Sequence, residues 1–484
     1  MAVASLAFAN AARYISYAGI PFVISDGWYF VDAFLQKYYQ GGVTLQDLYM
    51  KRSADDHAQP LHKLLLIWNA DTFGLDFVIE SYIGLALGAV AWLLMVYSAR
   101  QDNLARATSH WWTLAMVAAA FSLVSLSGGM VFNWSLVTLA YFGPLVMVGL
   151  AMASWEALER ARWWPLLVVA PLVIFTMDGT ALICSLSVTG AVVLRELKRR
   201  GSSWQKTGIV IAILVATVIA YRLVSHLYLH PPFAAPSSGP SGASTLLGLG
   251  WSRLAQMTLD IAALTVADPA ALKLFVPDNA VLLHKLLGAM VIAAHLWFWW
   301  RAVRDRWSRT QFIAVTVMLF CYGAAAGIVL GRVPLFGPEY VFQQRYLLMY
   351  QMGTVALALM AAGGDWTAWR LPQRLIVALM LLAVIAVQWP LSRATWMEAP
   401  YVQAYGNKLG RQMVLLGLNP DVKLVDCVPM LVICQADRAQ QVRSIELLKR
   451  RRLNAFSPDV IERHSLQSLR QDPGPAEVVP APAS

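Results

Sequence analysis

The chain has 484 residues, of which 58% are hydrophobic and only 14% are charged. Soluble domains usually carry about 25% charged residues, so this composition excludes an ordinary soluble enzyme and predicts an integral membrane protein. The net charge of +10 does not call for nucleic acid, because membrane proteins concentrate Lys and Arg on their cytoplasmic loops. We therefore expect membrane lipid, and no nucleic acid, among the partners.

Apolar runs of the length that crosses a bilayer recur through residues 1–390, the predicted transmembrane domain. They predict an all-α polytopic protein with about eleven transmembrane helices, near residues 3–24, 77–98, 111–128, 135–153, 164–177, 181–195, 207–225, 282–300, 310–330, 347–363 and 373–390. Asn10 and Arg13 interrupt the first run, for which a cleaved signal peptide is the alternative.

Lys and Arg are unevenly distributed between the two sets of connections. One set holds fifteen of them, whereas the short connections of the other set hold two, Arg332 and Arg345. The positive-inside rule makes the first set cytoplasmic. Three longer segments, 25–76, 226–281 and 391–484, then lie outside, which in a bacterial inner membrane is the periplasm.

The first outer segment is expected to form interfacial helices. Apolar side chains at helical spacing predict an amphipathic helix that Gly41-Gly42 ends; they belong to Val31, Phe34, Leu35 and Tyr38. Thr44 is a suitable N-cap for a second helix with Asp47 in its first turn. The apolar stretch 61–68 is expected to pack on the membrane interface.

The other two outer segments differ in composition. Segment 226–281 begins with a stretch rich in Pro, Gly and Ser and continues as a predicted helix over 250–276, so it is either a substrate lid or a linker. In segment 391–470 we expect two short strands around Pro429 and a basic helix near 438–453, a small α/β domain. Residues 471–484 are expected to be a disordered tail.

The four cysteines separate into two groups. Cys184 and Cys321 lie in predicted spans, where packing is their expected role. Cys427 and Cys434 lie on either side of the predicted Pro429 turn. In an oxidising compartment such a pair predicts a disulfide.

Polar residues suited to chemistry gather in patches on the predicted outer face. The first patch holds Asp26, Asp55, Asp56, His57, Gln59, His62 and Lys63. The second holds Glu339, Tyr340, Gln344, Arg345 and Tyr346, and a minor third holds Asn133, Trp134 and Asp178. The residues predicted to bind substrate are Asp55, Gln59, His62, Lys63, Glu339, Gln344, Arg345 and Tyr346. The alternatives are a solvated loop for the first patch and an arginine that extends to lipid headgroups for the second.

A carboxylate and an arginine at one membrane face suit sugar transfer from a lipid-linked phosphosugar. The carboxylate would deprotonate an acceptor hydroxyl, and Arg345 would bind the departing phosphate. A divalent metal such as Mg or Mn, held by Asp55 or Asp56, is a further candidate for stabilising that phosphate. A nucleotide sugar is not the expected donor, because no phosphate-cradling glycine loop is recognisable in the sequence.

The chain resembles the glycosyltransferase C superfamily, in particular its O-antigen glucosyltransferase-like members. The resemblance rests on Ser25-Asp26-Gly27-Trp28 directly after the first span, on the motifs 56–63 and 344–346, and on the layout of residues 1–390. It implies a polyprenyl-phosphate sugar donor, a glycan, lipid or protein acceptor, and Asp26 as catalytic base. Many members carry a second acid beside the first, where this chain has Gly27, so either Asp26 acts alone or Asp55 or Asp56 folds back beside it. Asp55 and Asp56 are the rival bases, and Asp56 and His57 are the additional catalytic candidates.

Two other functions compete with sugar transfer. A transporter or flippase of lipid-linked glycans would show paired broken helices near the midplane and an internal repeat, and the sequence has no convincing repeat. A glycan ligase or polymerase has a similar number of spans, but its main outer loop lies late in the chain. Here the loop richest in polar residues is the first one.

Overall fold

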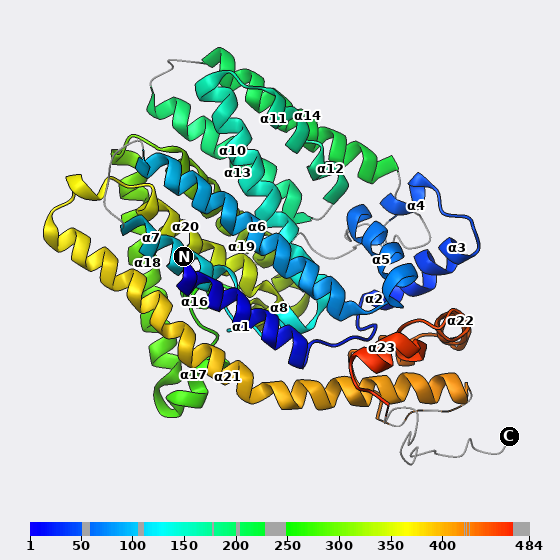
Figure 1. Ribbon diagram of the computed structural model, residues 1–484. Helices are drawn as coiled ribbons and strands as arrows, with labels where there is room; N and C mark the ends of the chain where they lie inside the picture. Colours follow the sequence, from blue (N-terminus) through cyan, green and yellow to red (C-terminus); the bar gives the residue numbers. More distant parts are fainter. Residues whose placement is uncertain are drawn as a thin grey trace.

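The computed structural model describes residues 1–50, 59–104, 111–176, 179–199, 204–227, 248–420, 422, 424 and 426–467. Most of them are helical, and no β-strand occurs within these ranges. The long helices form one bundle, and the two ends of the described chain lie far apart in it (Figure 1). The bundle helices are α1 (Ala2–Ala18), α6 (Phe77–Leu104), α7 (Trp111–Leu123), α10 (Phe142–Arg160), α13 (Gly179–Lys198), α14 (Trp204–Leu227), α18 (Ala280–Arg304), α19 (Arg309–Phe336), α20 (Leu347–Ala362) and α21 (Leu371–Leu418).

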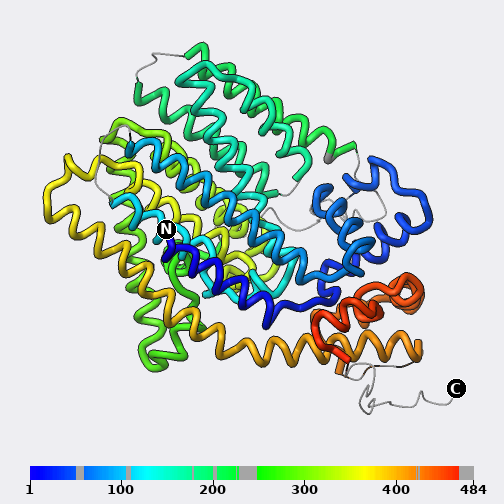
Figure 2. Tube along the Cα trace, viewed as in Figure 1, coloured from blue at the N-terminus to red at the C-terminus, as the bar shows by residue number. Residues whose placement is uncertain are grey.

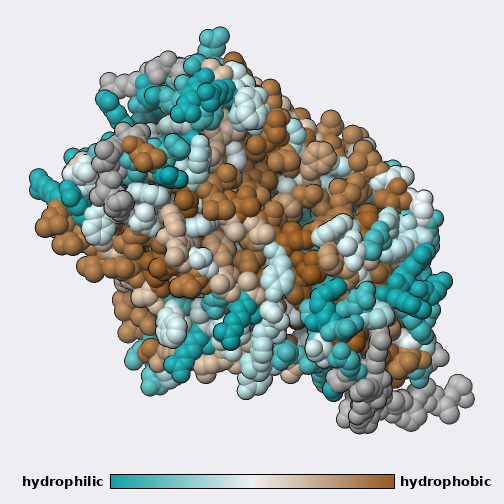
Figure 3. All heavy atoms as spheres, in the orientation of Figure 1, coloured by the Kyte–Doolittle hydropathy of each residue, from teal (hydrophilic) through white to brown (hydrophobic). Residues whose placement is uncertain are grey.

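Seven helices in the described ranges are long and apolar enough to cross a membrane. They are Phe77–Leu104, Ser135–Arg160, Gly179–Lys198, Trp204–Val224, Pro277–Arg304, Arg309–Phe336 and Leu371–Leu418. The visible surface carries a broad hydrophobic band with hydrophilic residues gathered at its two ends (Figure 3). The chain is therefore an all-helical protein with several apolar helices of membrane-spanning length.

The other predicted spans are helical but shorter than the roughly 20 residues that cross a bilayer. α1 has 17 residues, α7 has 13 and α20 has 16. The predicted span 164–177 is divided into α11 (Trp164–Val169) and α12 (Leu172–Thr176). Pro171 stands at the break and has no N–H to continue the helical hydrogen bonds.

α20 lies at the centre of the bundle. All but one of its residues are buried, and it packs mainly against α7 and α19. A helix that is apolar on every side needs such a complete coat of other helices. This explains why hydropathy predicts a span at 347–363 although the helix is short.

The helices predicted in the first loop are present among its described residues. α2 (Gly27–Tyr29), the π-helix η1 (Phe30–Leu35) and α3 (Gln36–Tyr39) form one continuous stretch, which ends before Gly41, whose φ is 77°. α4 (Leu45–Tyr49) begins with the predicted cap, since Thr44 and Asp47 form a capping box. α5 (Pro60–Phe73) then leads back to the bundle.

Short helices at the same end of the bundle complete this face. The predicted helix 250–276 is divided into α16 (Trp251–Leu264) and α17 (Pro269–Phe275), because Asp268 caps a new helix that starts with a proline. Most of the proposed lid, residues 228–247, lies outside the described residues. The remaining short helices here are α8 (Met130–Asn133), α9 (Ser135–Thr138), η2 (Leu139–Tyr141), η4 (Pro277–Asn279), η5 (Pro338–Phe342) and η6 (Gln344–Tyr346).

The C-terminal region differs from its predicted form. α21 continues without interruption through Pro390 and Pro400, so the predicted boundary at residue 391 falls inside a 48-residue helix. The helix expected near 438–453 is present as α22 (Arg438–Arg450). The expected second strand is wrong, because Val432–Gln435 form a 3-10 helix, η8. η9 (Asn454–Phe456) and α23 (Pro458–Arg463) follow and lie beside the first loop (Figure 2).

The bundle has two ends that differ in the segments they carry. The "loop end" carries residues 19–50 and 59–76, α8, α16, α17, η5, η6 and residues 426–467. The "basic end" carries residues 99–104, 156–164, 195–199, 301–309 and 363–374, which include η7 (Trp366–Ala368). Successive long helices alternate in direction between these ends, as α6 and α19 illustrate by starting at opposite ends (Figure 1).

Candidate functional site

Asp26, the acid that follows the first helix, lies at a strained bend of the backbone. The preceding Ser25 has a φ of 48°, in the left-handed region that residues other than glycine rarely adopt. Asp26 is the N-cap residue of α2 and is half-buried. Such strain persists only where surrounding contacts hold it, and it is frequent at functional sites.

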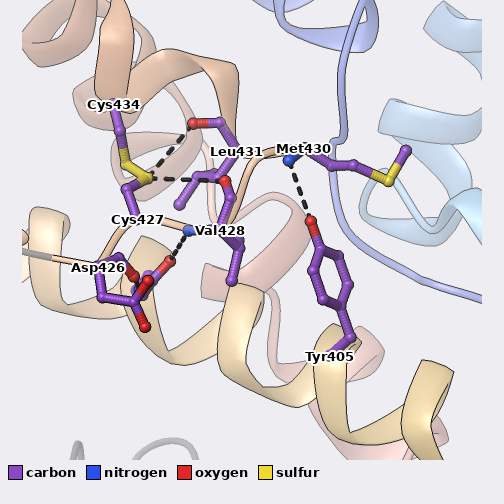
Figure 4. The surroundings of a disulfide bond; sticks show 8 residues. Tyr405, Asp426, Cys427, Val428, Met430, Leu431 and Cys434 are labelled. Carbon is purple, nitrogen blue, oxygen red and sulfur yellow. Dashed lines mark hydrogen bonds between the residues drawn. A yellow bond between two sulfur atoms is a disulfide. The ribbon is translucent and has the colours of Figure 1, made fainter.

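The contact that holds this bend comes from the C-terminal region. The Ser25 N–H donates to the carbonyl oxygen of Met430 at 2.7 Å. Met430 lies in the loop closed by a disulfide between Cys427 and Cys434, and its own N–H donates to the Tyr405 hydroxyl on α21 at 3.0 Å (Figure 4). The disulfide expected from the sequence is thus present, and its loop supports the backbone beside the candidate catalytic acid.

A histidine paired with an acid lies next to the same bend. His62 Nε2 is 3.2 Å from Oε2 of Glu80, a fully buried residue in the first turn of α6. With its proton on Nε2, the imidazole donates to Glu80 and keeps the Nδ1 lone pair. Nδ1 is buried and has no hydrogen-bond partner in the described part of the chain. His62 lines a small pocket together with Gly27, Trp134 and Ser135, so its Nδ1 could accept a proton there.

A chain of buried polar groups continues from Glu80 to the C-terminal helices. Asn69 donates from Nδ2 to Glu80 Oε1 at 2.9 Å, and its Oδ1 accepts the Asp76 N–H at 3.0 Å. The Asp76 carboxylate is fully buried and contacts Arg463 at 2.5 Å and His464 at 2.9 Å. Burial of a charge is unfavourable unless the charge is paired. This series of paired polar groups therefore connects α5 and α6 to α23.

Asn454 makes a second connection between the C-terminal region and the first loop. Its side-chain amide donates to the carbonyl oxygens of Pro21 at 2.9 Å and Leu75 at 2.7 Å. Its Oδ1 accepts the Val23 N–H at 3.1 Å. This fully buried asparagine therefore connects the backbone at the start of the first loop with the backbone at its end.

Two further residues of the first predicted patch act on the local backbone. Lys63 is buried, and its ammonium donates to three carbonyl oxygens at the end of α4, at distances of 2.6–3.0 Å. Gln59 has a φ of 48° and precedes Pro60, the first residue of α5. The other candidates of this patch lie outside the described residues; they are Asp55, Asp56 and His57.

Arg345, in the second predicted patch, is held between two tyrosine rings. Its guanidinium carbon lies 5.5 Å from the Tyr340 ring centroid and 5.2 Å from that of Tyr346, and it donates to the Tyr340 hydroxyl. No carboxylate forms a salt bridge with it within the described ranges, and its buried Nε has no partner there. Burial raises the pKa of the Tyr346 phenol, although the positive charge of Arg345 partly opposes this. An oriented arginine without an acidic partner is suited to bind an anion.

The neighbours of Arg345 have different roles. Gln344 donates from Nε2 to Asp268 Oδ2 at 3.5 Å. Asp268 also caps α17, and its burial raises the pKa of its carboxyl group despite these hydrogen bonds. Glu339, also predicted to bind substrate, is exposed and pairs with Arg253 on α16 at 2.5 Å. Glu339 therefore fastens η5 to α16.

The minor patch at Asn133 and Trp134 lies between the other two. α8 packs against η6, and Gly128 just before it lies so close that an added Cβ would be 3.2 Å from the Gln344 carbonyl oxygen. On the other side, the Asn133 carbonyl oxygen accepts the Ile20 N–H at 3.3 Å, and Trp134 lines the pocket that contains His62. The segment 128–135 thus lies between the pocket that contains His62 and the group formed by Arg345 and its two tyrosine neighbours. Asp178 lies outside the described residues.

Sequence reasoning missed the acids that organise this site. Glu80, Asp76 and Asp268 are each at most 5% exposed, and each contacts a polar residue of a predicted patch or of the C-terminal region. An ionisable residue at the start of an apolar span is itself a functional signal, and Glu80 carries it. Within the described ranges no three acidic, His or Cys side chains form a metal-binding group. The proposed metal ligands Asp55 and Asp56 lie outside those ranges.

No protein-family model, curated protein or solved structure matches this chain.

Proposed function

We propose that the protein is a membrane glycosyltransferase that moves a sugar from a polyprenyl-phosphate donor to a glycan, lipid or protein acceptor. The observation that carries this proposal is the bridge formed by segment 128–135. It links the pocket beside Asp26 and His62 to the guanidinium of Arg345, which forms no salt bridge within the described ranges. A base and a phosphate-binding cation at one end of an apolar bundle are the two groups that such a transfer needs.

In the proposed reaction Asp26 takes the proton of the acceptor hydroxyl. The hydroxyl oxygen attacks the anomeric carbon, the bond from that carbon to the phosphate oxygen breaks, and polyprenyl phosphate leaves with the electron pair. Direct displacement inverts the configuration of the sugar. Arg345 stabilises the charge that develops on the departing phosphate, and its tyrosine neighbours keep the guanidinium oriented.

The location of the site is part of this proposal. We propose about eleven spans in a bacterial inner membrane, with the loop end on the periplasmic side, because Lys and Arg are enriched in the connections at the other end. The disulfide between Cys427 and Cys434 at the loop end supports this orientation, since the periplasm is oxidising. The competing functions are a transporter or flippase of lipid-linked glycans and a glycan ligase or polymerase, and among the described residues no contact at the site favours either one.

The proposal is tested with purified protein in lipid nanodiscs and a panel of synthetic polyprenyl-phosphate hexoses and pentoses. A bacterial envelope extract supplies acceptors, and mass spectrometry measures the released polyprenyl phosphate. We expect wild-type protein to release it from at least one donor. Asp26→Asn preserves the shape of the site, and we expect it to reduce release by about 10²–10⁴-fold because the base is lost.

Two further variants make the result specific. Asp71→Asn changes an exposed acid of the same loop, whose partners are Tyr38 and Tyr39, and it should leave turnover unchanged. His62→Gln tests the competing base. If Asp26→Asn turns over normally and His62→Gln is inactive, the base is His62; if wild-type protein uses no donor, the glycosyltransferase proposal is wrong.

A further inference from the structure

A second polar cavity lies at the basic end of the bundle, away from the proposed transferase site. It has a volume of about 600 Å³, within the range of pockets that hold small ligands. Its walls come from the end of α18, the start of α19, the segment 365–370 and the start of α21. No residue of the proposed transferase site lines it.

The cavity carries an excess of positive charge. Four arginines line it against two acids; they are Arg301, Arg304, Arg306 and Arg370, with Asp305 and Asp365. Asp305 is already paired with Arg301 at 2.5 Å, and Asp365 caps the short helix at residue 366 by accepting the Thr367 N–H at 3.0 Å. The other three arginines are exposed, so the cavity is suited to an anion.

Aromatic rings give this charge a fixed geometry. The guanidinium carbon of Arg301 lies 4.7 Å from the Trp369 ring centroid, and that of Arg304 lies 5.3 Å from the Trp300 ring centroid. Trp369 is only 5% exposed, and its buried indole N–H has no hydrogen-bond acceptor in the described part of the chain. A buried donor in a basic cavity calls for an acceptor oxygen, which a bound phosphate would supply.

The start of α21 adds a further positive element. Arg370 and Gln373, which line the cavity, are the N-cap and third residue of this 48-residue helix. The N-terminus of a helix carries a partial positive charge and free N–H groups, and it favours phosphate.

Apolar surface continues from the cavity along both helices. On α18 the side chains of Leu296 and Val303 are 68% and 74% exposed, and on α21 those of Leu375 and Leu379 are 48% and 64% exposed. A ligand that places an anionic group in the cavity can therefore place hydrocarbon chains against these helices. Basic pockets of this kind between membrane helices bind anionic lipid headgroups.

We propose that this cavity binds the phosphodiester headgroup of an anionic membrane lipid. The lipid belongs to the leaflet at the basic end and is distinct from the sugar donor of the proposed reaction. The arginines neutralise the phosphate, and the indole N–H of Trp369 donates to one of its oxygens. This binding does not depend on the proposed transferase activity.

The test uses the full chain in detergent and measures binding of short-chain phosphatidylglycerol by native mass spectrometry. Short-chain phosphatidylcholine and inorganic phosphate are the two comparison ligands. We expect phosphatidylglycerol to bind, and to bind more weakly as salt is raised. Equal binding of phosphatidylcholine, or equal binding of inorganic phosphate, would overturn the proposal in favour of general lipid contact or a free anion.

Variants locate the binding. Arg304→Ala with Arg370→Ala removes two exposed charges and should weaken phosphatidylglycerol binding by about 30-fold. The matched control, Arg411→Ala with Arg450→Ala, removes two exposed charges from the other half of α21 and from α22, and it should change nothing. Trp369→Phe keeps the ring but removes the N–H, and it should weaken binding by several-fold. Unchanged binding in both cavity variants would show that the lipid lies elsewhere; the wild-type comparison of ligands stands even if a variant fails to fold.

Discussion

The two ends of the bundle both contain arginine, acids and aromatic rings, but the polar contacts at each end join different kinds of segment. At the basic end, ion pairs join the ends of the long bundle helices to one another, as Arg195–Glu159 does for α13 and α10 and Arg309–Glu156 does for α19 and α10. At the loop end, Asp76 pairs with His464, a residue 388 positions away. The difference indicates that the basic end stabilises the bundle itself, whereas the loop end joins separate segments around a site.

The loop end also leaves functional groups without protein partners. Within the described ranges the Nδ1 of His62 and the Nε of Arg345 are buried and unpaired. A fold that pairs Asp76 and Glu80 so completely leaves such groups open only at a cost in stability. We therefore regard these two positions as the places where substrate groups complete the hydrogen bonding.

Among the variants that test this difference between the two ends, Asn454→Ala should have the largest effect on stability. The substitution removes the hydrogen bonds to Pro21, Val23 and Leu75 and leaves their buried backbone groups unsatisfied. We expect the free energy of unfolding to fall by about 2–4 kcal/mol. Hydrogen exchange should increase in residues 19–26 and 427–467 and stay unchanged at the basic end.

Gln435→Ala is the matched control, because Gln435 is an exposed amide of the same C-terminal region. It should leave exchange unchanged everywhere. Equal loosening of both ends in Asn454→Ala would mean that the ends are one cooperative unit, and the proposed division between them would be wrong.

A somewhat smaller effect is expected from Arg345→Ala on binding of a short-chain polyprenyl phosphate. Loss of a charge-assisted contact should weaken binding by about 1.5–3 kcal/mol, while the thermal unfolding midpoint stays near that of wild type. Arg345→Lys keeps the charge but loses the planar fork, so its affinity should be intermediate.

Arg253→Ala is the matched control for Arg345→Ala, because Arg253 lies at the same end of the bundle but forms a salt bridge with the exposed Glu339. It should leave affinity unchanged. Equal loss of affinity in Arg253→Ala and Arg345→Ala would mean that only the general positive potential matters.

The smallest effect concerns Asp47, whose pairing is local although it lies at the loop end. Burial alone would raise the pKa of its carboxyl group, but hydrogen bonds from Lys37 and Thr44 outweigh burial and lower it below 3.8. The resulting stability is present above the unfolded-state pKa and is lost as the pH falls through the lowered folded-state pKa. Asp47→Asn should lower the free energy of unfolding by about 1 kcal/mol near pH 7, and the difference should shrink in acid.

Thermal unfolding of the two proteins between pH 7 and pH 3 measures this dependence. A difference that stays constant with pH would assign the contribution of Asp47 to hydrogen bonding alone.

The class of the protein and many of its local structures follow from the amino-acid sequence alone. Composition and run length give an all-helical membrane-type chain because burial in lipid requires continuous apolar helices. Thr44 and Asp47 announce a helix start, and Cys427 and Cys434 are close enough in sequence to meet across one short loop. These features depend on neighbours in the chain, so local chemistry is enough to predict them.

Hydropathy was less reliable where local and tertiary requirements differ. The apolar residues of 430–435 suggest a strand, but a strand needs a partner, and in the described structure they pack around the disulfide loop as a 3-10 helix instead. α21 continues past residue 390 because its second half packs against α22 and η9 rather than ending at a membrane surface.

Which polar residues meet depends on the packing of the whole bundle. The pairing of His62 with Glu80, the support of Ser25 by Met430 and the position of segment 128–135 all depend on how helices far apart in sequence are rotated and packed. A buried acid in an apolar helix predicts that a polar partner lies nearby, but the spacing of apolar residues does not identify the partner residue. The partner is fixed by the geometry of the whole bundle, because a buried charge is stable only where a complementary group reaches it.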